Sequence, residues 1–103
     1  MAKLSLVAKP TFTSKVSIPV AGEKAVVVAF TFKARTRDAF KAFVENLSDR
    51  EDVDVILDVA SGWDLEDAFD RDNIELMTQS YLGAARAIIE AYLSELTAAR
   101  AKN

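Results

Sequence analysis

Apolar and polar positions alternate along the first third of the chain, which is the pattern of half-buried β-strands. The alternation runs over residues 12–20 and resumes over residues 24–32. Gly22 lies between the two runs, where a residue that tolerates positive φ suits a tight turn. These features predict a β-hairpin over about residues 12–33. Pro19 cannot donate a ladder hydrogen bond, so the first strand is expected at a sheet edge, and the hairpin needs helices to pack on.

Beyond the hairpin the apolar spacing lengthens to that of an α-helix, and a first helix is predicted to begin near Thr36. Its apolar face comprises Phe40, Phe43, Val44 and Leu47. A second helix is predicted to begin after Ser48, whose hydroxyl and Glu51 have the spacing of a capping box. Its apolar face comprises Val53, Ile56, Leu57 and Ala60. Gly62 then suits the residue just past the helix end.

Two more helices are predicted in the second half of the chain. Asp64 and Asp70 have the character of N-caps, and Ile74, Met77 and Tyr81 continue one apolar face after them. The last helix, from Gly83 to about Ala99, is rich in alanine, the strongest helix former. Its apolar seam comprises Ala85, Ile88, Tyr92, Leu96 and Ala99, widened by Ile89 and Leu93. The sequence thus predicts an α+β fold of one domain, mainly helical, with an N-terminal hairpin and about four helices over residues 36–100.

Composition narrows the functions open to this chain. Its 103 residues suit a single domain, and it has no cysteine and no histidine. Disulfides and thiolate metal sites are therefore excluded, and the commonest general base is missing. The short apolar run near the N-terminus does not resemble a signal peptide, and no stretch has the length of a membrane span. These observations predict a soluble, unexported protein.

The net charge of −3 is distributed unevenly. Residues 1–48 carry eight basic and three acidic side chains, whereas residues 49–80 carry two basic and eleven acidic ones. Residues 81–103 carry three basic and two acidic side chains. This asymmetry fits either a solvated acidic face or electrostatic matching, head to tail between copies or with a basic partner.

Candidate catalytic and ligand-binding motifs are scarce. No serine lies in a nucleophile elbow, and the three glycines are too far apart to form a phosphate-binding loop. The acidic residues between 49 and 72 lack the spacing of a calcium loop, so capping and solvation explain them better than a metal site. We therefore expect no catalytic residue, no cofactor and no metal.

Two aromatic groups remain as candidates for binding. Phe30 and Phe32 lie close to a basic group formed by Lys33, Arg35, Arg37 and Lys41. A nucleic-acid platform could combine such features, but the acidic balance and the inward strand face argue against it. Trp63 fits either a core anchor or a contact for a protein partner, together with Leu65 and Phe69.

The second half of the chain contains a distinctive series of residues. They are Ala60-Ser61-Gly62-Trp63-Asp64-Leu65, then Phe69, Asn73, Leu76, Tyr81, Ala84 and Ile88, then Ala91-Tyr92-Leu93, Glu95-Leu96 and the ending Ala99-Arg100-Ala101-Lys102-Asn103. By this series, and by a similarity that extends back to Phe30–Arg37, residues 28–103 resemble the phage tail assembly chaperone family of long-tailed phages. Leu82 stands where members often have a proline, which suggests a helix continuing through residues 81–83.

The resemblance implies a non-enzymatic protein of phage or prophage origin that works in the bacterial host cytoplasm and is absent from the mature virion. Its partner would be the tape measure protein, kept soluble while the tail tube assembles around it. A frameshift-extended form would contact the tail tube protein. A homo-oligomer is expected, with no nucleic-acid or membrane partner. The alternative is a small structural virion protein, either a tail accessory or a head–tail connector.

The last predicted helix offers further candidate contact residues. Tyr92, Leu93 and Leu96 would touch the tape measure protein or another copy of the chain, because the apolar face is wider than one neighbouring helix covers. Burial inside the monomer is the equal alternative for all three.

Overall fold

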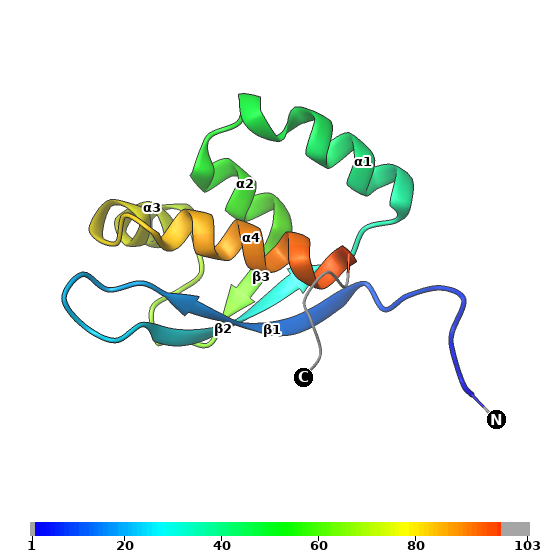
Figure 1. Ribbon diagram of the computed structural model, residues 1–103, viewed down its shortest axis with the longest axis horizontal. Coiled ribbons are helices and arrows are strands. Elements are labelled where there is room, and N and C mark those ends of the chain that lie inside the picture. Colours follow the sequence, from blue (N-terminus) through cyan, green and yellow to red (C-terminus); the bar gives the residue numbers. More distant parts are fainter. Residues whose placement is uncertain (1, 98–103) are drawn as a thin grey trace.

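Helices cover one face of a small antiparallel sheet in the computed structural model of the chain, which describes residues 2–97 (Figure 1). Within that range the elements are β1 (Thr11–Ile18), β2 (Val26–Lys33), α1 (Arg37–Asn46), the short 3-10 helix η1 (Leu47–Asp49), α2 (Asp52–Val59), β3 (Ala60–Trp63), α3 (Arg71–Ser80) and α4 (Ala84–Thr97). The predicted α+β class and the hairpin followed by four α-helices are confirmed for this range. The expected helical residues 98–100, including Ala99, lie outside the described residues.

The predicted hairpin forms with the expected faces. β1 and β2 pair antiparallel, with Phe12 opposite Phe32 at one end and Ile18 opposite Val26 at the other. In the turn, Gly22 has φ of 77° and the Glu23 amide donates to the Val20 carbonyl at 3.0 Å. Most inward residues of both strands are buried, but Phe12 is half-buried and Val26, beside the turn, is 51% exposed. β1 lies at the sheet edge as predicted. The opposite face carries mainly exposed side chains.

A third strand, which the sequence analysis missed, completes the sheet. β3 pairs antiparallel with β2, with Trp63 opposite Phe30 and Ala60 opposite Phe32. Ala60 was expected on a helix face and Gly62 at a helix end, but α2 stops at Val59 and Ala60 is already extended. The free edge of β2 supplies hydrogen bonds that no local pattern records, and this tertiary pairing overrides the helical spacing.

Asp64 ends this new ladder instead of capping a helix. Its backbone amide donates to the Ala29 carbonyl, and its carboxylate accepts from the Ala29 amide, both at 3.0 Å. The predicted helix from Asp64 is therefore wrong, and residues 64–70 form a non-helical loop. Both hydrogen-bonding groups of the β2 backbone at Ala29 are satisfied in this way.

Two of the predicted helix starts are confirmed, and a second one, in addition to Asp64, is corrected. Thr36 caps α1 by accepting from the Ala39 amide, and Asp70 caps α3 by accepting from the Asn73 amide. Ser48 does not cap α2, because it lies within the 3-10 turn η1. The residue before α2 is Glu51, which makes no side-chain capping bond.

Two further expectations are also corrected, one about a helix face and one about the continuity of a helix. Val44 was expected to face inward but is 45% exposed, because α1 lies at the periphery and buries only Phe43. The chain does not continue as a helix through Leu82, since α3 ends at Ser80 and α4 begins at Ala84. Gly83 lies in this break, where a Cβ atom would come within 3.0 Å of Pro19 Cγ, so a larger residue would push the α3–α4 connection away from the hairpin.

Candidate functional site

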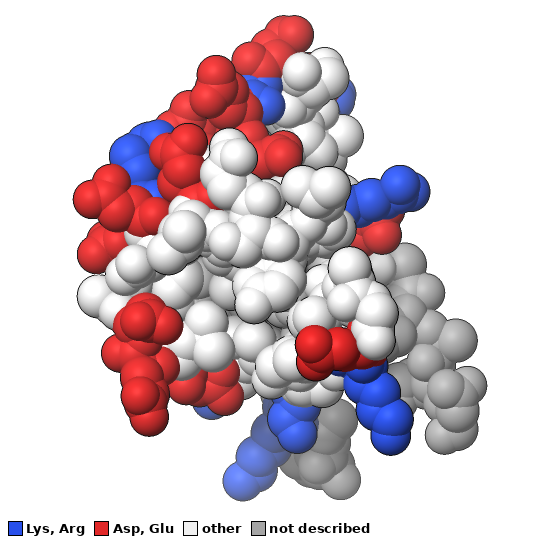
Figure 2. Space-filling view, turned by 90° about the vertical axis from the view of Figure 1, so that its left-hand side faces the viewer, with Lys and Arg blue, Asp and Glu red and all other residues white. Residues whose placement is uncertain are grey.

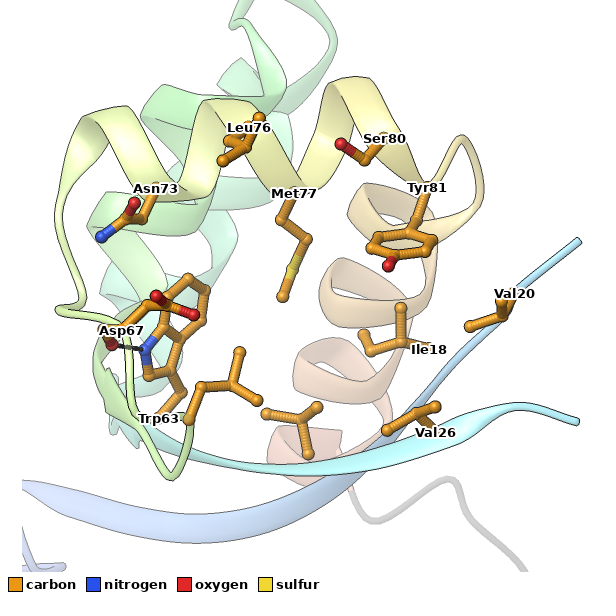
Figure 3. A pocket seen from close by; sticks show the side chains of 12 residues that line it. Ile18, Val20, Val26, Trp63, Asp67, Asn73, Leu76, Met77, Ser80 and Tyr81 are labelled. Atoms are coloured by element: carbon orange, nitrogen blue, oxygen red, sulfur yellow. Dashed lines mark hydrogen bonds between the residues drawn. The ribbon is translucent and has the colours of Figure 1, made fainter.

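An open apolar groove lies between the turn end of the hairpin and α3 (Figure 3). We call it the α3 groove; its volume is about 370 Å³. It is lined by Ile18, Val20, Val26, Val28, Trp63, Leu65, Asp67, Asn73, Leu76, Met77, Ser80 and Tyr81. Such dimensions and a mostly apolar lining with a few polar groups are typical of ligand- and peptide-binding sites.

The position of α3 defines one wall of the α3 groove. Ile74 is fully buried and holds α3 on the core, while the Asp70 cap determines where the helix begins. The Met77 side chain points from α3 toward the sheet (Figure 3). Methionine is flexible and polarisable, so this wall can adapt to apolar partners of different shape.

Trp63 closes the α3 groove at the end of β3. Its ring meets Phe30 edge-on at 5.9 Å and Phe69 at 5.1 Å, measured between ring centroids. Its Nε1–H donates to the Asp67 carbonyl at 2.7 Å, which ties the loop after β3 to the indole. The side chain is half-buried and also lines the groove. Trp63 is therefore a packing anchor that leaves part of its surface to the groove.

Of its two predicted companions, only Leu65 reaches the same surface. Leu65 lines the α3 groove, whereas Phe69 packs against Trp63 and is absent from the groove lining. Phe69 thus supports the site without forming its wall. The sequence analysis missed Val26, Leu76 and Met77 as groove residues, because hairpin and helix patterns do not say which elements meet.

Large apolar side chains are exposed along the rim of the α3 groove. Leu76 is 64% exposed, Val26 51% and Tyr81 41%. Figure 2 shows this side of the molecule as a broad uncharged area with carboxylates gathered along one side. Contiguous exposed apolar surface with a charged border is the usual appearance of a protein-binding site.

The candidate contact residues of α4 are not equivalent. Tyr92 is fully buried, so of the two alternatives open for it, burial inside the monomer is the one that the structure shows. Its hydroxyl donates to the Lys33 carbonyl and accepts from Arg35 Nη1, both at 2.7 Å. Leu93 and Leu96 are half-buried and pack against the core, which leaves some of their surface open.

Arg35 belongs to a structural cluster with Asp58 and Phe43. Its guanidinium forms an ion pair with Asp58 at 2.8 Å and lies over the Phe43 ring at 4.5 Å. Phe30 and Phe32, the aromatic residues of the considered platform, are fully buried and offer no ring face to a base.

Asp58 joins two arginines and thereby connects three parts of the fold. Besides Arg35 it accepts from Arg50 at 2.7 Å. Partial burial raises the pKa of the Asp58 carboxyl, but the hydrogen bond from Arg50 and the charge and hydrogen bond of Arg35 outweigh it. The net effect is a lowered pKa. A carboxyl with a lowered folded-state pKa stabilises the fold above its unfolded-state pKa, and this contribution is lost as pH falls through the folded-state pKa.

This linkage predicts a pH-dependent effect of Asp58→Asn. At neutral pH the variant is expected to lose about 1–2 kcal/mol of unfolding free energy, because Arg35 and Arg50 lose the charge of their shared partner. The deficit should begin to shrink as pH falls below the ordinary carboxyl pKa of 3.8, and it should disappear as pH falls through the lower folded-state pKa, where Asp58 of the parent protein becomes neutral. Urea unfolding of both proteins across this pH range measures the difference.

Asp54→Asn is the matched control, since Asp54 pairs with Arg71 on the surface and both side chains are about half exposed. It should change stability little at any pH. A constant Asp58→Asn deficit from neutral to acidic pH would contradict the linkage.

Two further kinds of feature, a metal-binding cluster and a membrane-spanning helix, were searched for among the described residues. Residues 2–97 contain no group of three or more acidic side chains placed to hold a metal ion. Over the same range, no helix combines the length and the apolar character needed to cross a bilayer.

Comparison with known protein families identifies a relationship over the whole chain. The family model described as phage tail assembly chaperone matches residues 1–103. No curated protein and no solved structure matches the chain.

Proposed function

The chain belongs to the phage tail assembly chaperone family, and from this premise we propose that it binds the tape measure protein and supports assembly of the tail tube around it. Family membership indicates a role in tail assembly and points to a non-enzymatic one. We place the activity in the bacterial host cytoplasm and expect the protein to be absent from the finished virion.

The observation that carries this proposal is the α3 groove with its exposed apolar rim. A tape measure protein is long and helical, and it aggregates when its apolar stripes are uncovered. A chaperone for it needs an apolar surface that accepts one face of a helix. Trp63, Met77 and Leu76 supply large and adaptable side chains on that surface.

The charge of the surrounding chain supports the same role. Residues 49–80, which include α2, α3 and the loop before α3, carry eleven acidic and two basic side chains. An excess of carboxylates favours solubility more than an excess of lysines does. A complex in which this acidic part faces water would keep an otherwise insoluble helical partner in solution.

Co-expression with the tape measure protein tests the proposal, and Leu76→Lys is the informative variant. Leu76 is 64% exposed on the groove rim, so a lysine there should leave the fold intact while placing a charge against the apolar partner. We expect the parent chain to hold the tape measure protein in the soluble fraction and to co-purify with it. Leu76→Lys should lose most of this effect.

Val44→Lys is the matched control, because Val44 is also an exposed apolar residue of a helix but lies away from the α3 groove. It should solubilise the tape measure protein as the parent does. Equal loss in both variants, or no solubilisation by the parent chain, would overturn the proposal. Finding the chain in purified virions would favour a structural tail protein instead.

A further inference from the structure

The outer edge of β1 presents backbone groups that no residue in the range 2–97 pairs with. Their direction follows from the hydrogen bonds of β2. The Ala29 amide and carbonyl both bond to Asp64 at 3.0 Å, on the β3 side of the strand. Since successive residues of a strand point these groups to opposite sides, the neighbours of Ala29 bond to β1. Ala34 belongs to the same alternate set as those neighbours, and its amide donates to the Pro10 carbonyl at 2.8 Å, as this alternation requires.

The same alternation leaves every second residue of β1 facing away from β2. Ser14 lies opposite Phe30 and Val16 opposite Val28, so the even-numbered residues of β1 use their backbone groups in the ladder. The other set has exposed side chains, and its backbone groups bond to nothing else in the described range. It comprises Thr11, Thr13, Lys15 and Ser17. The outer edge of β1 therefore offers the N–H and C=O groups of these residues to a further strand.

The two edges of the sheet differ in how well they can accept another strand. β3 has only 4 residues, and its register with β2 shifts between Thr31 and Phe32. Short length and an irregular register are two of the ways in which proteins protect a sheet edge. β1 has 8 residues and pairs with β2 without interruption. Of the two edges, β1 is therefore the one suited to the addition of an extended peptide.

α4 leaves room above this edge for the inward side chains of an added strand. α4 packs on β1, whereas α2 packs on β2 and β3 (Figure 1). Ile88 of α4 is buried in the core, and Ile89 faces α2 across a hollow that Val55 also lines. The helical period then places Ala87 and Ala91 on the flank away from α2, above the outer edge of β1. Both are small and half-buried, so apolar side chains of an added strand have room to pack beside them.

Charge indicates which kind of strand fits this edge. β1 and β2 contain Lys15 and Lys33 and no acidic residue, and Lys9 precedes β1. Alternate side chains of an added strand would lie next to Lys15, where carboxylates are favoured, and the others beside α4, where apolar groups are favoured. We propose that the outer edge of β1 binds an extended segment of a partner protein in which acidic and apolar residues alternate. The inference goes beyond the proposed function, because the α3 groove is a different surface and takes only Ile18 from β1.

Amide hydrogen exchange measured by NMR tests the proposal residue by residue. The probe is a synthetic peptide of glutamate–valine repeats, and a peptide of lysine–valine repeats is the control. At saturation the glutamate peptide should slow exchange of the Thr11, Thr13, Lys15 and Ser17 amides about tenfold, because each gains a hydrogen bond. The intervening amides of β1 already bond to β2 and should change little. The lysine peptide should leave all of them unchanged, since its charges meet Lys15.

Lys15→Pro separates the backbone of the edge from its charge. The Lys15 amide points away from β2, so a proline there keeps the β1–β2 ladder, as prolines of edge strands do. Affinity for the glutamate peptide should fall about tenfold, because one hydrogen bond is lost and the ring obstructs the approaching strand. Lys15→Ala is the matched control: it removes the charge but keeps the N–H, so binding should weaken while the alternating protection remains. Thermal unfolding checks the fold of both variants, and the exchange pattern of the parent protein needs no variant.

Four results would contradict strand addition at this edge. They are unchanged exchange of the alternate amides at saturating glutamate peptide, equal binding of the two peptides, parent-like binding by folded Lys15→Pro, and perturbation confined to residues of the α3 groove. The free protein provides a further check. If the same amides became protected without peptide as protein concentration rises, the occupant would be a second copy of the chain, and the proposed acidic partner would be wrong.

Discussion

Replacing Tyr92 with alanine should lower the free energy of unfolding by about 3–5 kcal/mol, the range for truncating a buried aromatic residue. Tyr92 is fully buried in the centre of the core, with its ring 5.3 Å from that of Phe32 and 5.8 Å from that of Phe43. Its hydroxyl also joins the end of β2 to α4 through the Lys33 carbonyl. Truncation would leave a cavity where α1, α4 and the sheet meet. Chemical unfolding measures the loss.

Tyr92→Phe separates packing from hydrogen bonding at the same position. It keeps the ring contacts and removes the hydroxyl, so the Lys33 carbonyl and Arg35 each lose a partner. The expected cost is about 1–2 kcal/mol. If Tyr92→Ala cost no more than Tyr92→Phe, the ring would not be a core element, and its complete burial would be contradicted.

Trp63→Ala is expected to have the second largest effect, on both stability and partner binding. The loss of unfolding free energy should be about 2–3 kcal/mol, less than for a fully buried aromatic residue because Trp63 is half-buried. The ring contacts with Phe30 and Phe69 disappear, and the loop after β3 loses its tie through the Asp67 carbonyl. One wall of the α3 groove is removed at the same time. Solubilisation of the tape measure protein should therefore fall even at temperatures where the variant remains folded.

Trp63→Phe is the control for this variant. A phenylalanine can keep the contacts with Phe30 and Phe69 but cannot donate to the Asp67 carbonyl, so it should cost about 1 kcal/mol. Most partner binding should be retained, because an aromatic side chain still closes the groove. Full solubilisation by Trp63→Ala, measured on folded protein, would show that the α3 groove is not the binding surface.

Local patterns in the sequence were sufficient to predict the hairpin and most of the helical part. Alternation identified β1 and β2, and capping residues located the starts of α1 and α3 because Thr36 and Asp70 act on amides three residues away. β3 could not be predicted in this way. Its residues form a strand only because β2, about 30 positions earlier, has a free edge, and the sequence around Gly62 also fits a helix end.

The candidate site was predictable only in part, for a related reason. Trp63 and Leu65 were singled out as large apolar residues in a loop, and both line the α3 groove. Val26 and Met77 belong to elements that meet only in the folded chain. For Tyr92 the wide apolar helix face left partner contact and burial equally open, and only the packing of the sheet and α1 around its ring decides for burial.

The order of strands in the sheet has a consequence for synthesis on the ribosome. β2 is central, but its two neighbours are made at different times: β1 just before it, and β3 only after residues 34–59. A nascent chain that ends within α1 therefore presents one unpaired edge of β2 beside an uncovered apolar sheet face. Unpaired edges of this kind recruit strands from other chains. Until translation passes Trp63, the nascent chain therefore exposes a strand edge that can pair with other chains, and its own synthesis has a stage prone to aggregation.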